Sequence, residues 1–227
     1  MLEARDLRLT APDGAAALAG VTLFAHPGDL LVLIGGHGSG KSAVLRSVAG
    51  LARPDRGLIR LDGTDVTSLG PHARAARGIA YVGGAERIIE RLSVCDNLLV
   101  GAWRRRDRPA VRRQLSEWFE RFPSLAAAAR RPAAVLGAGD RVAAALGRAW
   151  LSDPRVLLVD EPLAGVDARS RAGIAGVLRA ASEAGRIVVC TAHDVVDAAI
   201  ARRVNVLSGG QLVFSGAPAA LAAAAFE

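Results

Sequence analysis

The most informative stretch of this chain of 227 residues is Gly35-Gly36-His37-Gly38-Ser39-Gly40-Lys41-Ser42. It matches the phosphate-loop pattern G-x-x-x-x-G-K-[ST], in which glycine amides wrap the phosphates of a nucleotide and a lysine reaches the β- and γ-phosphates. The chain has 29 basic residues, and Lys41 is the only lysine among them. Because a planar guanidinium does not replace a compact ammonium in such a loop, these eight residues are predicted to bind nucleotide phosphates.

The segments on either side of the loop agree with this prediction. Residues 29–34 form an apolar run that is typical of a buried strand entering the loop, and residues 42–49 have the pattern of a helix leaving it. A glycine-rich turn that ends in Gly-Lys-Ser by chance is the alternative, but it would not require this strand-loop-helix context. In a phosphate loop, the hydroxyl of Ser42 would be a ligand of Mg²⁺.

A second chemical element is the apolar run 156–159, which is followed by Asp160 and Glu161. Acids often follow strands, but an acid pair downstream of a phosphate loop is typical of ATPases. Asp160 is predicted to hold the hydration shell of Mg²⁺, and Glu161 to polarise the attacking water. His193 follows the next predicted strand and would reach the γ-phosphate from there, although a lone histidine is more often a surface or core residue.

The composition argues against membrane-spanning and secreted classes of protein. Hydrophobic residues make up 51% of the chain, yet no apolar run approaches the ~18–20 residues that span a bilayer. Residues 1–6 are charged and lack the apolar stretch of a signal peptide. Cys95 and Cys190 are isolated and show neither metal-site spacing nor a disulfide framework. We therefore expect a reduced cytoplasmic compartment.

The formal net charge of +7 is unevenly distributed along the chain. Residues 85–150 contain 13 arginines and 7 acidic residues, with the densest group at 104–113. Such a cluster would suit a nucleic acid or anionic lipid head groups. It has no interleaved aromatic residues and no known nucleic-acid motif, which favours a solvated helical face. No nucleic-acid partner is expected.

The predicted elements change in character along the chain, from strands to helices and back to strands. Apolar residues at helical spacing, punctuated by prolines, indicate several short helices between 88 and about 146. Strands are expected at 7–9, 21–25, 58–61, 78–82, 155–160 and 186–190, with a hairpin at 204–214 and an alanine-rich helix or tail at 217–225.

This order predicts an α/β fold with a phosphate-loop NTPase core on a parallel sheet, an antiparallel β subdomain and an inserted helical subdomain. The expected division is 1–84 for the first part of the ATP-binding core, 85–147 for the helical subdomain and 148–227 for the second part of the core.

Taken together, these residues resemble the ATP-binding subunits of ABC transporters, and the resemblance covers essentially the whole chain. The phosphate loop, the Asp160-Glu161 strand, a following loop with Asp167 and a switch histidine at His193 have the order and spacing of that family. Segments 87–101 and 118–125 are similar to those of importers for branched-chain amino acids, urea or amides. The resemblance implies a dimer of ATP-binding subunits that sandwiches ATP and Mg²⁺. It also implies transmembrane permease subunits as partners and a peripheral position on the cytoplasmic side of the inner membrane.

The chain departs from the family pattern at three places. The family's glutamine, which contacts magnesium and the membrane partner, falls at Gly84. The Leu-Ser-Gly-Gly-Gln signature falls at 136–140, where Gly137 replaces the serine and Asp140 adds an acid that would repel the γ-phosphate. The aromatic residue that usually stacks on adenine would lie near residues 11–12, which are alanine and proline.

The sequence thus predicts an ATP-hydrolysing motor subunit of an importer, in which ATP closes a dimer and hydrolysis reopens it. Gly84 and Gly137 leave a second interpretation open, namely an ATP-binding subunit with impaired hydrolysis in a regulatory or heterodimeric role. In a homodimer both sites would lack the glutamine and the serine. In a heterodimer one site would lack the glutamine and the other site would lack the serine. A soluble ABC ATPase of DNA repair or translation fits less well, because such proteins typically need tandem cassettes or long coiled-coil insertions.

Overall fold

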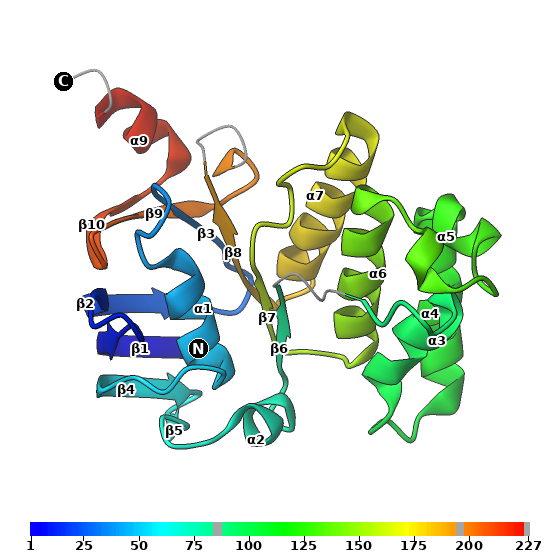
Figure 1. The fold of residues 1–227 in the computed structure, drawn as a ribbon, viewed down its shortest axis with the longest axis horizontal. Helices are drawn as coiled ribbons and strands as arrows, with labels where there is room; N and C mark the ends of the chain where they lie inside the picture. The colour runs from blue at the N-terminus through cyan, green and yellow to red at the C-terminus, as the bar shows by residue number, and fades with distance from the viewer. Residues whose placement is uncertain (84–87, 194–197, 225–227) are drawn as a thin grey trace.

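The computed structural model describes residues 1–83, 88–193 and 198–224. The elements are stacked in layers (Figure 1). Helix α1 (Lys41–Ala49) lies between an antiparallel sheet and a larger, mainly parallel sheet, and helices α6 (Ala138–Leu151) and α7 (Ala168–Glu183) cover the opposite face of the larger sheet. The remaining helices of the inserted region lie outside α6. The predicted α/β fold class is confirmed by this architecture.

The larger sheet has the strand order β10-β9-β3-β8-β7-β6. The strands from β9 to β6 run parallel, and β10 closes one edge as the antiparallel partner of β9. β3, β7 and β8 are buried along their whole length, because both faces of the sheet are covered. The strands are β3 (Leu30–Ile34), β6 (Ile79–Val82), β7 (Val156–Val159), β8 (Ile187–Ala192), β9 (Arg203–Ser208) and β10 (Gln211–Gly216).

The smaller sheet is antiparallel and has the order β2-β1-β4-β5. The first two strands are longer than the segments 7–9 and 21–25 that the sequence indicated. β1 pairs with β2 on one side and β4 on the other, and register shifts interrupt both ladders, so the apolar alternation is broken where the strands continue. The strands are β1 (Leu2–Thr10), β2 (Ala16–Ala25), β4 (Arg56–Leu61) and β5 (Thr64–Asp65).

The inserted region consists of several helices, most of them short, as the prolines predicted; the exception is α4 (Arg108–Arg121), which has 14 residues. Ser93 begins the first of them, since its hydroxyl accepts a hydrogen bond from the Asp96 amide at 3.0 Å. Pro123 begins another directly after the preceding helix ends. The helices not yet given are α2 (Pro71–Ala75), α3 (Val94–Leu99), η1 (Val100–Ala102), α5 (Pro123–Ala127), η2 (Ala133–Val135) and α9 (Pro218–Ala224).

Two hydrophobic cores lie on the two faces of the parallel sheet. Leu31 and Leu33 of β3 face the core shared with α1 and the antiparallel sheet, whereas Leu30 and Val32 face the core shared with α6 and α7. This alternation follows from the two-residue period of a strand. The sheet is therefore held rigidly from both sides, and its loops carry the functional groups.

The expected division of the chain at 147/148 falls inside α6, which continues to Leu151. The division itself stays a prediction. In the part of the chain that the structure describes, every helix is too short or too polar to cross a membrane.

Candidate functional site

The segments expected to form the nucleotide site meet at the carboxyl edge of the parallel sheet. β3 pairs with β8, and β8 pairs with β7, so the loops that follow these three strands leave the sheet on the same side. In the ladders, Ile34 is the partner of Ala192, and Val159 is the partner of Cys190. Residues that are distant in the sequence are brought together there.

Two glycines of the phosphate loop occupy positions that exclude a side chain. Gly35 has a φ of 152°, and a Cβ there would lie 2.2 Å from the carbonyl oxygen of Leu207. Gly40 has a φ of 100°, and its Cβ would lie 2.6 Å from the carbonyl oxygen of Ala17. The loop is therefore packed closely between β2 and the turn after β9, which places its backbone in one conformation.

The ammonium of Lys41 lies over this loop. Its Nζ donates hydrogen bonds to the carbonyl oxygens of Gly35 at 2.8 Å and Gly36 at 2.9 Å. α1 begins at Lys41 without a side-chain cap from Gly40, so the amides of its first turn are available to an anion. The buried hydroxyl of Ser39 also lacks a hydrogen-bond partner among the described groups. These donors fit the phosphate oxygens of a nucleotide.

Ser42 and Asp160 meet although they are 118 positions apart. The Oγ of Ser42 lies 3.0 Å from Oδ1 of Asp160. The hydroxyl of Thr191 donates to the same Oδ1 at 2.7 Å and accepts from the amide of Glu161 at 2.8 Å. The hydroxyl of Tyr81 lies 3.3 Å from Oδ2 of Asp160. Thr191 thus orients both acids from the neighbouring strand.

The hydroxyl and carboxylate oxygens of Ser42 and Asp160 are of the kind that Mg²⁺ prefers. Within the described residues there is no group of three or more His, Cys, Asp or Glu that would hold a metal ion by itself. Mg²⁺ is commonly bound through one or two protein groups together with substrate phosphates and waters, so the oxygen donors present fit such a site. The Mg²⁺ ligands stay a prediction.

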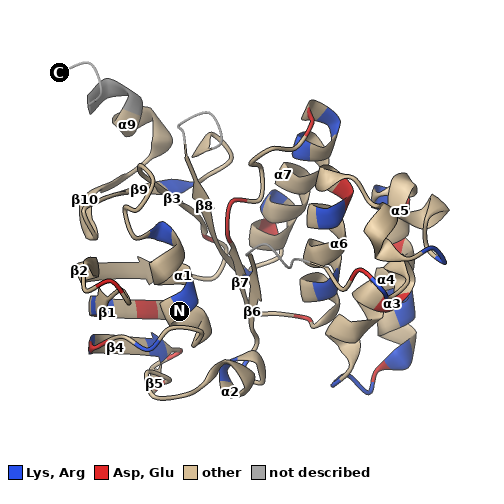
Figure 2. Cartoon of the chain, in the orientation of Figure 1, with Lys and Arg blue, Asp and Glu red and all other residues tan. Residues whose placement is uncertain are grey.

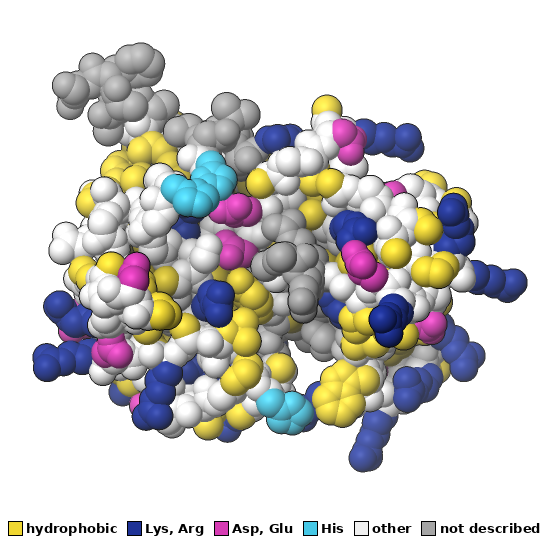
Figure 3. Space-filling model, viewed as in Figure 1, with side chains coloured by type: hydrophobic (Ala, Val, Ile, Leu, Met, Phe, Trp, Pro, Cys, Tyr) yellow, Lys and Arg dark blue, Asp and Glu magenta, His cyan; other side chains and the backbone are white. Residues whose placement is uncertain are grey.

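Glu161 and His193 form the next pair of the site. The Nε2 of His193 lies 2.8 Å from Oε1 of Glu161. Glu161 has a φ of 49°, a conformation that a residue other than glycine seldom adopts. The ring of His37 stacks on the ring of His193, with centroids 5.8 Å apart and planes inclined by 8°. Histidine side chains lie beside acidic ones on this face (Figure 3).

Sequence reasoning did not identify Thr191 and Tyr81 as members of the site. Thr191 is a polar residue near the carboxyl end of an otherwise apolar strand, which is the signal that could have indicated it. Its contact with Asp160 depends on the parallel register of β7 and β8, and that register is decided by packing.

The segment at the position of the family signature lies at the start of α6. Gly137 is the exposed N-cap of this helix, with a φ of −70° and no atom within 4 Å of a Cβ built on it. A serine would therefore fit sterically at this position. The carboxylate of Asp140 accepts a hydrogen bond from the hydroxyl of Ser124 at 2.7 Å. Its negative charge remains at the first turn of α6.

The N-terminal ends of α6 and α7 are packed tightly against each other. A Cβ on Gly139 would lie 2.2 Å from Oγ of Ser170. Asp167 caps α7 by accepting from the amides of Arg169 and Ser170, each at 3.0 Å, and from the Ser170 hydroxyl at 2.6 Å. The hydrogen bond from the Ser170 side chain is the main cause that lowers the pKa of Asp167 below its ordinary value. The loop after Glu161 and the signature segment therefore share one packed unit.

For two departures from the family pattern, at Gly84 and at residues 11–12, the structure gives less information. Gly84, at the expected position of the glutamine, lies outside the described residues. Residues 11–12 belong to the turn between β1 and β2, and β2 contacts the phosphate loop through Ala17. The effect of the missing aromatic residue on adenine binding stays a prediction.

A phosphate loop after β3, an acid pair after β7 and a histidine after β8 define a phosphate-loop NTPase of the α/β class. Within that class the chain belongs to the ABC transporter family, whose sequence model matches residues 18–164. ATP-binding subunits of this family bind ATP and are ATPases coupled to transport that work with transmembrane permease subunits at the cytoplasmic face of the membrane. This chain is one of them.

Individual relatives have different substrates. The chain is 36% identical to a phosphonates import ATP-binding protein, PhnC, of Alcaligenes faecalis, over 97% of this chain and 84% of the relative. It is 33% identical to the lipopolysaccharide export system ATP-binding protein LptB of Escherichia coli K12, over 90% of this chain and 86% of the relative. A dimeric post-hydrolysis structure of the ATP-binding cassette MJ0796, bound to ADP and Pi, has a TM-score of 0.86 at 23% identity. The match covers 96% of this chain and 99% of the MJ0796 chain. At this identity, the likeness to MJ0796 shows that the two chains share a fold.

Proposed function

We propose that this chain is the ATP-hydrolysing motor subunit of an importer for a small solute. The observation that carries the proposal is that Lys41, Ser42, Asp160, Glu161 and His193 surround one phosphate loop. Together they supply the groups that phosphoryl transfer needs, and they lie at the start of α1 or directly after buried strands, which hold them in place.

The roles follow from the chemistry of each group. Lys41 moves its ammonium from the loop carbonyls to the β- and γ-phosphates of ATP. Ser42 and Asp160 would hold Mg²⁺, which would neutralise charge on the phosphates. Glu161 accepts a hydrogen bond from the attacking water and polarises it, and His193 donates to the γ-phosphate. Thr191 keeps Asp160 in place and fixes the amide of Glu161.

The solute is inferred from the resemblance of segments 87–101 and 118–125 to importers for branched-chain amino acids or the related urea and amide systems. The relatives found by comparison are named for other cargoes, among them phosphonates, sn-glycerol-3-phosphate and molybdate or tungstate. Because the cargo is bound by other subunits, transport of labelled leucine by membranes that contain the complete system is the direct test. If ATP is hydrolysed but leucine is not taken up, the assignment of the cargo is wrong and the motor function stands.

A second function, an ATP-binding subunit with impaired hydrolysis in a heterodimer or a regulatory role, is favoured by Gly137 and Asp140. In a closed dimer the signature of one chain faces the phosphate loop of the other. Gly137 offers no hydroxyl to the γ-phosphate there, and Asp140 brings a negative charge. Phosphate release by the purified chain, alone and with a second ATP-binding subunit, separates the two functions. Turnover of about 1–10 per second by the chain alone would exclude impairment.

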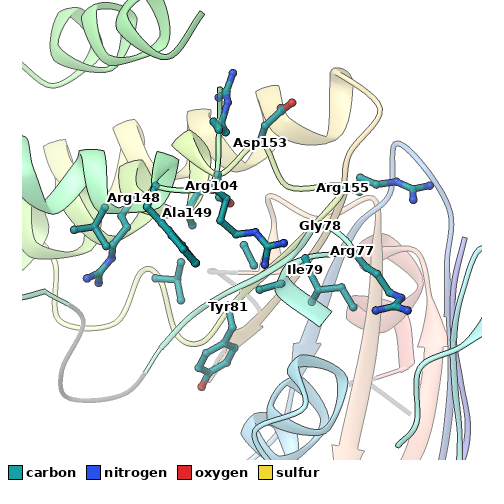
Figure 4. Close-up of a pocket in the computed structure, with 18 of the residues that line it drawn as sticks. Arg77, Gly78, Ile79, Tyr81, Arg104, Arg148, Ala149, Asp153 and Arg155 are labelled. Carbon is teal, nitrogen blue, oxygen red and sulfur yellow. The ribbon is translucent and has the colours of Figure 1, made fainter. Parts of the chain in front are cut away.

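The partner surface that we propose for the permease is a groove between the core and the inserted helices. It lies between β6 on one side and η1 with the C-terminal half of α6 on the other (Figure 4). Movement of the inserted helices relative to the core changes such a groove directly. ATP-driven closure of the dimer is thereby transmitted to whatever segment is bound there.

A further inference from the structure

Arginines gather at one corner of the inserted region, around the start of α4. Figure 2 shows basic residues on α4 and on the segment before it, at the end of the molecule away from the antiparallel sheet. Arg104, Arg106, Arg108 and Arg112 are all exposed there. The density of arginines in the sequence favoured a solvated helical face, and the structure adds which of these charges have acidic partners.

Two other arginines of the same stretch are neutralised by nearby acids. Arg105 forms an ion pair with Asp107, and Nε of Arg113 lies 3.8 Å from Oε1 of Glu117, one turn further along α4. None of the four exposed arginines has a carboxylate partner within residues 1–83, 88–193 and 198–224. Four positive charges are therefore presented to solvent together.

The helical period separates two of these charges from the acids of α4. Arg108 and Arg112 are four positions apart, so their side chains lie on the same side of the helix. Glu117 is about 140° round the helix from Arg112, and Glu120 lies about 12 Å further along its axis. The side of α4 that carries Arg108 and Arg112 is therefore positive over its first turns.

An exposed tryptophan borders the arginines. Trp103 is 66% exposed, and Cζ of Arg104 lies 5.7 Å from the centre of its ring. Indole rings are amphipathic and are enriched at the level of lipid head groups, where their apolar part and their N–H group are both accommodated. A tryptophan followed by several arginines is typical of segments that lie on a membrane surface.

This corner adjoins the groove that we propose for the permease. Trp103 and Arg104 line the groove, whereas Arg106, Arg108 and Arg112 lie outside it. Because a permease lies in the membrane, residues just outside the groove face the surface of the bilayer beside it. The arginines that line the groove are Arg77, Arg104, Arg105, Arg148 and Arg155 (Figure 4).

We propose that a basic corner, which consists of Trp103, Arg104, Arg106, Arg108 and Arg112, binds anionic phospholipid head groups of the leaflet that it faces. Each guanidinium pairs with a lipid phosphate through two parallel hydrogen bonds, and the indole lies among the head groups. The inference rests on the proposed function, in which the permease brings this chain to the membrane, and it adds a direct contact with lipid.

The experiment uses the full chain and vesicles of two compositions. One kind contains equal parts of phosphatidylcholine and phosphatidylglycerol, and the other contains phosphatidylcholine alone. Co-sedimentation measures the partition coefficient of the chain at low and at physiological ionic strength. We expect binding to the anionic vesicles to be about tenfold or more tighter, with a preference that falls as salt is added. Equal binding to both kinds of vesicle, or no binding to either, would overturn the proposal.

Matched variants assign the site. Replacement of Arg106, Arg108 and Arg112 by glutamine removes three charges of the basic corner and should weaken binding to the anionic vesicles about tenfold or more. The control replaces three exposed arginines on the side of the antiparallel sheet and lowers the net charge equally; it should change binding less than twofold. Its changes are Arg46→Gln, Arg53→Gln and Arg56→Gln. Equal losses in the two variants would show attraction by net charge alone and would overturn the proposal.

A variant that keeps the charge controls for damage to the fold. Replacement of Arg106, Arg108 and Arg112 by lysine should keep the preference for anionic vesicles and weaken binding by only about threefold, since an ammonium attracts phosphate but lacks the two parallel hydrogen bonds. Circular dichroism of all variants shows whether the fold is kept. If the lysine variant is folded but binds as weakly as the glutamine variant, charge on this corner does not hold the chain at the lipid, and the proposal fails.

Tryptophan fluorescence reports the position of the indole. The chain has three tryptophans, and Trp103 is exposed whereas Trp118 is 3% exposed. Anionic vesicles should therefore protect part of the emission from quenching by acrylamide, and Trp103→Phe should remove that protection. The same protection in the Trp103→Phe chain would overturn the proposal, because another part of the molecule would then lie at the lipid surface.

Other anions are outcomes of the same assay. A short oligoribonucleotide or inorganic phosphate, at the concentration of accessible lipid phosphate, should displace little of the bound chain. If the oligoribonucleotide displaces it and binds the parent but not the glutamine variant, the corner recognises nucleic acid. If inorganic phosphate displaces it, the ligand is a free anion. Either result would overturn the proposal.

Nucleotide binding keeps this test separate from the proposed function. The glutamine variant of the basic corner should bind ATP as the parent chain does, since its three positions lie in the inserted region, away from the phosphate loop. If the parent binds ATP and dimerises but does not prefer anionic vesicles, the lipid contact fails while the motor function stands. If the parent fails to bind ATP, the motor function fails whatever the vesicles show.

Discussion

The Nε2 of His193 lies 2.8 Å from Oε1 of Glu161, so the residue that follows β8 contacts the loop that follows β7. The ring of His37, in the phosphate loop, stacks on a face of the same imidazole. Three loops of the site are thereby connected through one histidine.

Replacement of Lys41 by alanine should weaken ATP binding by about 100-fold or more, because charge-assisted hydrogen bonds to the phosphates contribute about 1.5–3 kcal/mol each. Lys41→Arg should weaken it as well, since a guanidinium does not fit between the carbonyls of Gly35 and Gly36. Calorimetric titration measures the affinity, and circular dichroism shows whether the fold is kept. ATP affinity within twofold of the parent chain would show that the loop is not the phosphate site.

Replacement of Glu161 by glutamine should lower ATP hydrolysis by about 100-fold and leave ATP binding in place, because only the carboxylate polarises the attacking water. The ATP-bound dimer should then accumulate on gel filtration with ATP and Mg²⁺. Thr191→Val is a useful comparison, since it removes the hydroxyl that holds Asp160 while Glu161 is kept. A Glu161→Gln chain that stays monomeric under all conditions, with a partner ATP-binding subunit present, would contradict the motor function.

Replacement of Gly137 by serine should raise turnover about tenfold or more if a missing hydroxyl limits hydrolysis, since one donor to a developing charge contributes about 2.7–4 kcal/mol. The structure has room for the side chain, because no atom lies within 4 Å of the Cβ position. Gly137→Ala is the control that adds bulk without a hydroxyl. If the single change is silent but Gly137→Ser with Asp140→Gln restores activity, the acid of Asp140 is the limiting feature.

Replacement of Gly101 by alanine should destabilise the fold by about 1–3 kcal/mol or more, because the new methyl group would lie 1.7 Å from the carbonyl oxygen of Arg148. The contact joins η1 to α6 beside the arginine-lined groove. Gly70→Ala is the matched control, since Gly70 has an ordinary φ of −71° and open space around it. Urea unfolding of both variants measures the difference in free energy; equal stability would show that η1 and α6 are not packed as described.

The cap of α7 should make stability depend on pH at the acid end. The pKa of Asp167 is lowered in the folded chain from its ordinary value of 3.8, chiefly by the Ser170 hydroxyl. A lowered pKa means that the contribution is present above that ordinary value and is lost as the pH falls through the folded pKa. Asp167→Ala should therefore lower the unfolding temperature at pH 7, and the difference from the parent should shrink below about pH 4. A constant difference down to pH 2.5 would exclude this origin.

Much of the nucleotide site was predictable because its chemistry is local. The glycine spacing, the single lysine and the apolar run before Asp160 specify a phosphate loop and an acidic strand end without reference to the rest of the chain. The α/β class followed from the order of apolar segments. The ends of β1 and β2 were harder to predict, because the pairing of these strands continues beyond the segments in which apolar and polar residues alternate, across register shifts.

By itself, then, the sequence determined the phosphate loop, the acid pair and the alternation of strands and helices, since each depends on neighbours within a few positions. Only the tertiary structure decided that β8 lies between β3 and β7, which brings Thr191 to Asp160 and His193 to Glu161. The arginine-lined groove also arises from segments that are far apart in the chain. These contacts depend on strand order, on register and on the packing of α6 against the sheet. All three are determined by the burial of apolar side chains on both faces of the parallel sheet.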